Sequence, residues 1–152
     1  MASEQMVSTD MRGGSIVTPL VIVRYWGPVG LYAGLIFFGS SISNPPEAIS
    51  SILKEVSDKV LHLCEYSILG ALLYRACRHT SGGWIARHAV WAAVAGSALY
   101  GVSDETHQLF VPFREADVLD IVADTVGGAV GAWSWRLLER RAVPPGVPQL
   151  DA

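Results

Sequence analysis

The segment from Tyr25 to Pro46 contains no ionisable side chain other than tyrosine, and it is continuously apolar or small from Leu31 to Phe38. A helix needs about 20 such residues to cross the hydrocarbon core of a bilayer. The Asn44-Pro45-Pro46 sequence ends the segment, because proline removes a backbone donor and restricts the residue before it. We therefore predict a membrane-spanning helix at residues 19–43.

Three further apolar segments predict helices at residues 59–77, 85–103 and 117–136. The chain is 51% hydrophobic and 16% charged, whereas about a quarter of the residues of a typical soluble domain are charged. A soluble four-helix bundle is the alternative, but a soluble helix should have a polar face, and Val90–Leu99 has none. We therefore expect an all-α polytopic membrane protein with a bundle of four transmembrane helices.

Small residues and chain ends complete this expected architecture. Two groups of glycines suit close helix contacts in lipid: Gly30, Gly34 and Gly39, then Gly127, Gly128 and Gly131. One membrane domain should occupy residues 16–141, between a disordered N-terminus at 1–15 and a disordered tail at 142–152. The N-terminus lacks the charged and then apolar pattern of a cleavable signal peptide.

Basic residues predict the orientation of the four expected spans. The side that holds both termini and the second loop carries eight arginines: Arg12, Arg24, Arg75, Arg78, Arg87, Arg136, Arg140 and Arg141. The opposite side carries Lys54, Lys59 and Arg114. Since cytoplasmic loops are enriched in Lys and Arg, both termini should be cytoplasmic. The net charge of −3 argues against nucleic acid as a partner and leaves membrane lipids as the expected one.

Polar residues concentrate between Ser103 and Gly128, and the predicted orientation places them on the outer side. They are Asp104, Glu105, His107, Gln108, Arg114, Glu115, Asp117, Asp120 and Asp124. In the second helix, His62, Glu65 and Tyr66 share a face at i, i+3 and i+4. Ionisable groups within a span are costly and usually functional, so we expect one polar pocket at the outer leaflet. Asp120 and Asp124 lie one turn apart and would repel each other if both were ionised and desolvated. One of them should therefore hold a proton, a cation or Arg114.

Three motifs carry these residues. They are Asp58-Lys59-x-x-His62-x-x-x-Tyr66, Asp104-Glu105-x-His107-Gln108-x-Phe110-x-Pro112-x-Arg114 and Asp120-x-x-x-Asp124-x-x-Gly127. Together they resemble the motifs of the VanZ-like membrane proteins, a family named for an accessory glycopeptide-resistance protein. The family often has asparagine at the position of Asp124. The resemblance implies a multi-pass protein of the bacterial cytoplasmic (inner) membrane and, for the named member, low-level teicoplanin resistance, but it supplies no established reaction.

Three functions are compatible with these residues. The first is binding of an envelope lipid or its phosphate group, since guanidinium geometry suits phosphate. The candidate ligand-binding residues are Lys59, His62, Glu65, Tyr66, Gln108 and Arg114. The second is a membrane-embedded hydrolase or transferase, for which these residues include ligand types that suit zinc or manganese. Its catalytic candidates are His62, Asp104, Glu105, His107, Asp120 and Asp124. The third is a structural role, in which a satisfied polar network fixes the helices.

Neither the reaction nor a cofactor follows from the sequence. The candidates match no HExxH motif or CxxC pair, and the chain has no G-x-S-x-G elbow or P-loop. If metal is used, His62 or Glu105 would act as the base toward a bound water. An ion pathway would also use acids within the membrane, but so short a chain would need to form a homo-oligomer.

Overall fold

A computed structural model describes residues 18–43 and 58–142. These residues form α1 (Pro19–Ser40), α3 (Asp58–Thr80), α4 (Gly83–Arg87), α5 (Ala89–Gln108) and α6 (Val118–Ala142). The described ranges contain no strand, so the predicted all-α fold class is confirmed. The predicted disordered N-terminus at 1–15 lies outside the described residues, and so does the predicted tail at 142–152 except for Ala142, which is the last residue of α6.

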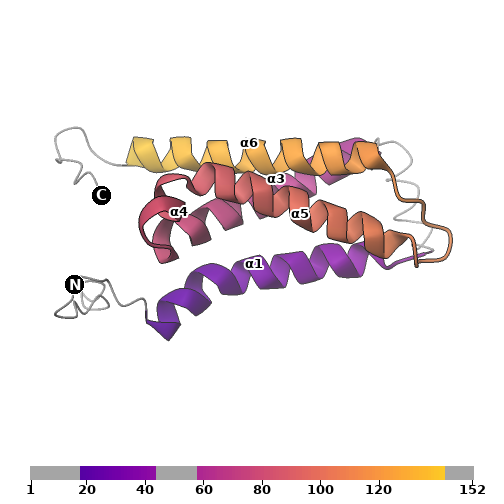
Figure 1. Ribbon diagram of the computed structural model, residues 1–152, viewed down its shortest axis with the longest axis horizontal. Coiled ribbons are helices and arrows are strands. Elements are labelled where there is room, and N and C mark those ends of the chain that lie inside the picture. Colours follow the sequence, from indigo (N-terminus) through magenta and orange to yellow (C-terminus); the bar gives the residue numbers. More distant parts are fainter. Residues whose placement is uncertain (1–17, 44–57, 143–152) are drawn as a thin grey trace.

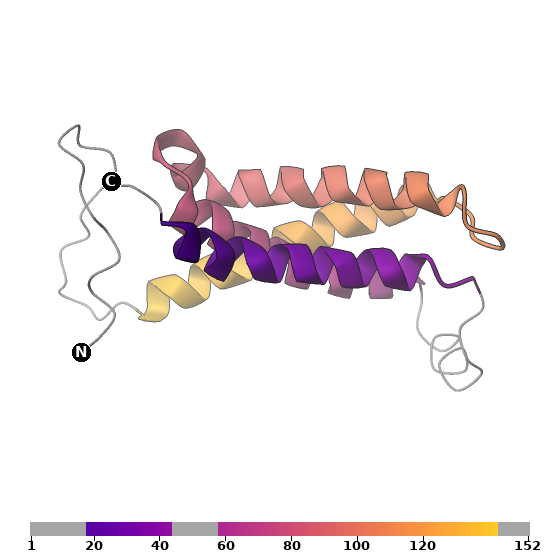
Figure 2. The ribbon, with the colours of Figure 1, turned by 90° about the horizontal axis from the view of Figure 1, so that it is seen from below.

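The four long helices run lengthwise beside one another, and the short α4 lies where the chain turns from α3 to α5 (Figure 1). α3 is central, because it packs against α6, α5 and α1. α1 packs chiefly on α3. In the view from below, α1 runs along the bundle in the foreground (Figure 2). The start of α1 and the end of α6 lie at the same end of the bundle, which we call the α4 end. The opposite end, where α1 stops and α3 begins, is called the polar end below.

Glycines allow α3 and α6 to approach closely. A Cβ added to Gly70 would overlap the backbone of Gly128, and one added to Gly131 would overlap the backbone of Ser67. The predicted contact role of the glycines of α6 therefore agrees with the packing. Gly30, Gly34 and Gly39 make no such contact among the described residues, where an added Cβ would meet nothing within 4 Å. Their faces of α1 are open because α1 packs against the bundle mainly through α3.

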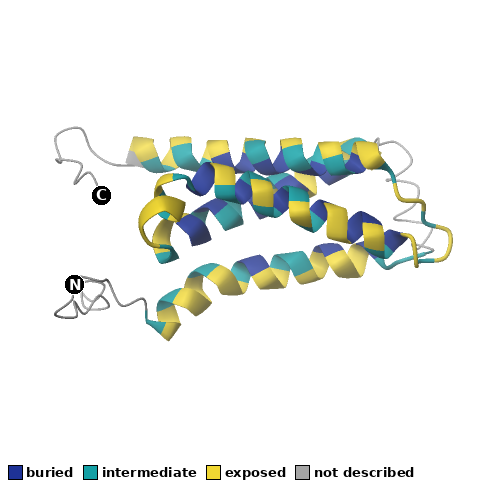
Figure 3. Ribbon diagram, viewed as in Figure 1, coloured by how far each residue is buried: buried dark blue, intermediate teal, exposed yellow. Residues whose placement is uncertain are grey.

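The buried residues gather where α3, α5 and α6 meet, whereas α1 is largely exposed (Figure 3). Large apolar side chains cover the outside of all four long helices, and Leu31, Leu99 and Val118 are 71%, 71% and 74% exposed. Among the described helices, only α1 is long and apolar enough to cross a membrane by length and composition alone. The other long helices contain more small, polar or charged residues. This apolar α1 indicates membrane association, but the criterion does not confirm the four predicted spans.

The third predicted helix, at 85–103, differs from the structure at both ends. The chain turns at Gly83, whose φ is +54°, forms the short α4, and breaks at His88 before α5 begins. The backbone N–H of His88 donates to the carbonyl of Trp84 at 3.1 Å, and the Nδ1 of its side chain lies 2.9 Å from the same oxygen. α5 then continues to Gln108. The apolar pattern ends at residue 103, but the helix does not, because the polar residues that follow are themselves buried.

Candidate functional site

Polar side chains are buried at the polar end of the bundle. Those that are less than a tenth exposed are Ser40, His62, Asp104, Glu105, Gln108, Asp120 and Asp124. They come from α1, α3, α5 and α6, so all four long helices contribute. Buried polar groups are costly unless they find partners. The contacts between these residues therefore determine what this end of the protein can do.

His62 on α3 and Asp124 on α6 form the deepest pair. His62 Nδ1 donates to Asp124 Oδ1 across 2.9 Å, and Asp124 is fully buried. The next turn of α3 places the ring of Tyr66 beside that of His62, with centroids 6.4 Å apart. The carboxylate fixes the orientation of the imidazole and leaves Nε2 as the ring nitrogen that can meet a ligand.

Lys59 joins the start of α3 to the start of α6. Its Nζ lies 2.5 Å from Asp117 Oδ2 and 2.6 Å from Asp120 Oδ1. The hydrogen bond from Lys59 lowers the pKa of the Asp117 carboxyl from its usual value. Asp120 and Asp124 thus have different basic neighbours, Lys59 and His62. Arg114, which the sequence offered as a neighbour for these acids, takes neither place.

The end of α5 connects the same acids to α1. Glu105 Oε2 accepts from the backbone N–H of Asp117 at 2.8 Å, and Gln108 Nε2 donates to Glu105 Oε1 at 3.1 Å and to Asp104 Oδ2 at 3.3 Å. Ser40 Oγ donates to Asp104 Oδ1 at 2.6 Å. A chain of bonds therefore runs from α1 to the start of α6, and with Lys59 it reaches α3. These residues and the His62–Asp124 pair are called the polar network below.

Serines of α1 are part of this site, and the sequence did not indicate them. Besides Ser40, the Oγ of Ser41 lies 2.9 Å from Nε2 of His107. Serine is too common near helix ends to mark a site. Two consecutive serines at the end of an apolar span, before a proline pair, were the available signal.

Glu65 and Arg114, which were predicted to belong to the site, lie apart from the polar network. Glu65 is exposed, because the buried face of α3 runs through His62, Tyr66, Leu69 and Gly70. Arg114 lies in the loop between α5 and α6, where its Nη2 donates to the carbonyl of Gly39 at 3.4 Å. Within the described part of the chain, Arg114 makes no ion pair with an acid. Its guanidinium therefore keeps most of its donors for other partners.

Negative charge exceeds positive charge inside the site. Four carboxylates are buried: Asp104, Glu105, Asp120 and Asp124. Among the described residues, the basic groups within ion-pair distance of them are Lys59 and His62. Asp124 Oδ2 and the hydroxyl of Tyr66 are buried and have no hydrogen-bond partner there. Buried charges in proteins are usually paired or bind metal, so this arrangement favours a cation or protons over a directly bound anion.

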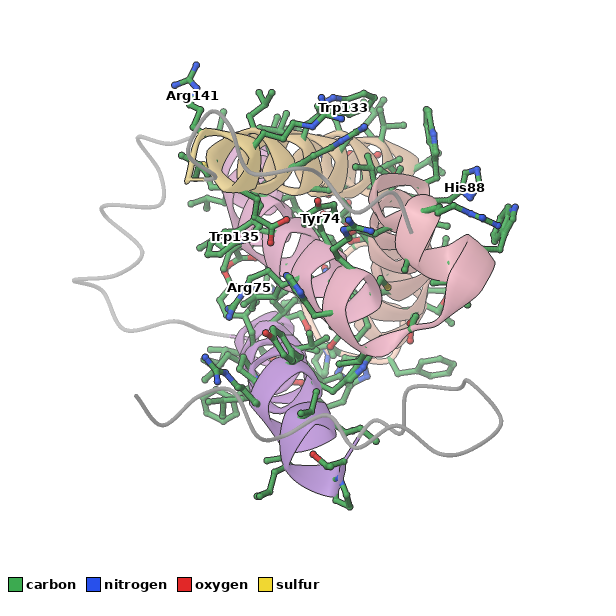
Figure 4. All side chains as sticks on the ribbon, turned by 90° about the vertical axis from the view of Figure 1, so that its left-hand side faces the viewer. Tyr74, Arg75, His88, Trp133, Trp135 and Arg141 are labelled. Atoms are coloured by element: carbon green, nitrogen blue, oxygen red, sulfur yellow. The ribbon has the colours of Figure 1, made fainter. Side chains whose placement is uncertain are left out.

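The α4 end has the opposite character. Seven arginines of the described residues belong to it: Arg24, Arg75, Arg78, Arg87, Arg136, Arg140 and Arg141. Arg75 lies over the ring of Trp135 at 4.9 Å and over that of Tyr25 at 5.6 Å, and Figure 4 shows Arg141 pointing outward. Glu139 accepts from the Tyr74 hydroxyl at 3.0 Å, which helps to explain why α6 continues past the predicted end at 136.

The fold and the site define a class of protein: an all-α bundle with an apolar surface and a buried acidic network at one end. A family model described as VanZ/LLP1 matches residues 19–139 of the chain, which is most of its length. The protein therefore belongs to the VanZ-like family, as the three motifs indicated. The match includes α1, which carries none of those motifs. Comparisons with curated proteins and with solved structures gave no significant match.

Proposed function

We propose that this VanZ-like protein is a multi-pass protein of the bacterial cytoplasmic membrane, in which α1, α3, α5 and α6 cross the bilayer. We propose further that it binds the phosphate group of an envelope lipid at the outer leaflet of that membrane. The exposed apolar residues on all four long helices support the spans, since a soluble monomer rarely exposes so extensive an apolar surface. The arginine-rich α4 end supports cytoplasmic termini. The polar end then faces outward.

The observation that carries the lipid role is the position of Arg114 in an exposed apolar loop. Phe110 and Phe113 in that loop are 80% and 87% exposed, and Leu109 beside them is also exposed. Aromatic residues are favoured at membrane interfaces. The φ of Phe113 is 64°, a costly conformation for a bulky residue, and such strain is found mainly at functional sites. Phenylalanines at the level of the acyl chains would hold the neighbouring guanidinium of Arg114 near lipid phosphates.

Lys59 has a smaller part in this proposal than its motif predicted. Its ammonium is held between Asp117 and Asp120, so a phosphate would have to compete with two carboxylates. The polar network positions the loop, because Glu105 holds the backbone N–H of Asp117 and Gln108 holds Glu105. The phosphate therefore binds at the edge of the network, at Arg114, and not among the buried acids.

Native mass spectrometry of the protein purified in mild detergent tests this function. The wild type should carry an anionic or polyprenyl phospholipid that is enriched over the bulk membrane lipids. Arg114→Gln should lose most of that enrichment. Arg87→Gln, an exposed arginine at the α4 end, is the matched control and should retain it. No enrichment in the wild type, or equal loss in both variants, would contradict the proposal and leave the polar network with a structural role.

A second candidate is a membrane-embedded hydrolase or transferase that acts on a lipid or envelope precursor. The His62–Asp124 pair favours it, because a buried carboxylate that orients an imidazole is the usual arrangement around a histidine base. Incubation with lipid phosphates and detection of released phosphate tests this activity. Turnover that is lost in His62→Gln and kept in Arg87→Gln would make catalysis the primary function.

A further inference from the structure

We propose that Asp58, His62 and Asp120 form a site for a divalent metal ion, of the manganese or zinc class, at the polar end of the bundle. One potential ligand atom from each residue lies within 4.8 Å of the other two. Asp58 and His62 are one turn apart at the start of α3, and Asp120 faces them from the first turn of α6. The imidazole and the two carboxylates can therefore converge on one ion without movement of the backbone.

The surroundings of His62 match those of a metal ligand. Its Nδ1 donates to Asp124 Oδ1 at 2.9 Å, and Asp124 is fully buried. Histidines that bind metal almost always donate their second ring nitrogen to a carboxylate or carbonyl, which orients the ring and makes the ligating nitrogen more basic. The pair therefore directs Nε2 of His62 as a ligand.

The burial of the Asp120 carboxylate, with no bond to Oδ1 that meets hydrogen-bond geometry, is independent support for a cation. Asp120 is 4% exposed, and its Oδ1 has no hydrogen-bond partner in the described part of the chain. Lys59 Nζ lies 2.6 Å from this oxygen as an ion pair. The contact that meets hydrogen-bond geometry is the one from Lys59 to Asp117. The ammonium thus neutralises Asp120 and occupies one side of Oδ1, so it has to move when a metal ion binds. Lys59 can turn to Asp117 alone when a metal ion arrives, because Asp117 lies at the surface and already accepts its bond.

The chemistry of the three ligands selects the class of ion. One imidazole nitrogen with two carboxylate oxygens suits manganese, iron and zinc better than calcium, which prefers oxygen alone. Asp58 is exposed, so the site opens toward the outer side and leaves positions for water or another oxygen ligand. A phosphate oxygen of the lipid is one such ligand. That role rests on the proposed function, whereas the metal site does not.

The test measures metal binding alone, in detergent and without added lipid. Metal-stripped full-length protein is titrated with Mn²⁺, and the loss of the electron paramagnetic resonance signal of the free aqueous ion reports binding. Zn²⁺ is then added as a competitor. One ion per chain should bind. Asp58→Asn, which alters an exposed residue and should fold normally, and Asp120→Asn should each weaken binding strongly, whereas Glu115→Gln, an exposed acid nearby, should not.

Two further variants separate a metal site from an ordinary acidic cluster. Asp124→Asn should weaken binding by about 10–100-fold through its effect on His62, as loss of an outer carboxylate does in other metal sites. Lys59→Gln should tighten binding by about tenfold or more, because it removes a competing positive charge. No binding of either ion to wild type and Lys59→Gln would overturn the proposal. Equal binding by Asp58→Asn, Asp120→Asn and Glu115→Gln would overturn it as well. Since lipid is absent, failure of lipid binding would not affect these results.

Discussion

His62 on α3 and Asp124 on α6 are joined by a hydrogen bond of 2.9 Å between Nδ1 and Oδ1, and both side chains are buried. Removing one partner leaves the other buried without its bond. Asp124→Ala should therefore lower the free energy of unfolding by about 3–5 kcal/mol, the range for a broken buried pair. Asp124→Asn keeps an acceptor for His62 and should cost only about 1–2 kcal/mol. Denaturant unfolding in detergent, followed by circular dichroism, measures both.

A double variant shows whether the pair itself matters. If His62→Ala and Asp124→Ala act through their mutual bond, the double variant should lose clearly less stability than the sum of the single losses. Additive losses would contradict a bond between these two side chains across the contact of α3 with α6.

Gly131 allows α6 to lie directly on α3. A Cβ at this position would overlap the backbone of Ser67, so Gly131→Ala should destabilise the protein by about 1–3 kcal/mol, as overpacking does elsewhere. Gly34→Ala is the matched control, since its added Cβ meets nothing within 4 Å. Alanine is the better helix former by about 1 kcal/mol, so Gly34→Ala should be neutral or stabilising. Thermal unfolding of both variants decides, and equal losses would show that these helices pack differently.

Asp117 makes the loop between α5 and α6 sensitive to acid. Its bond from Lys59 lowers the pKa of the Asp117 carboxyl below the unfolded value, which is about 4. The stabilisation is therefore complete above that pH and is lost as pH falls through the lower, folded value. Unfolding measured from pH 7 down to acid should show a decline below about pH 4 that is shallower in Asp117→Asn. Identical profiles would mean that the Lys59–Asp117 pair contributes nothing.

Resistance is the prediction taken from the named member of the family. Expression in a susceptible Gram-positive host should raise tolerance to teicoplanin more than tolerance to vancomycin. Dose–response curves at confirmed membrane levels measure this. An unchanged profile would remove resistance from the account of this chain.

The sequence predicted the starts of α1 and α3 closely because long apolar segments need little context, whereas the predicted ends at 43 and 77 are three residues too late for α1 and three too early for α3. α1 begins at residue 19 as predicted, and α3 begins at Asp58, one residue before the predicted start. The extension of α5 to Gln108 was not predicted, because a rule based on apolarity stops at the first charged residue. Asp104 and Glu105 continue the helix because they are buried against polar partners.

The polar site was predicted only as a set of residues. Helical spacing grouped His62 with Tyr66 and Asp117 with Asp120, but spacing within one helix cannot give partners on another. Lys59 reaches Asp120, and His62 reaches Asp124, because glycine contacts fix how α6 lies on α3. Glu65 shows the limit of the same rule. It shares a nominal face with His62, yet it is exposed because the buried face runs through Tyr66 and Leu69.

The outward orientation of the polar end is the central claim, and a pair of reporter fusions tests it most directly. Alkaline phosphatase, which is active only outside the cytoplasm, is fused after Ala152 in one strain and inserted after Glu115 in another. The account predicts an inactive fusion at Ala152 and an active one at Glu115, at matched protein levels. Activity at Ala152 with none at Glu115 would place the polar network in the cytoplasm and contradict the account.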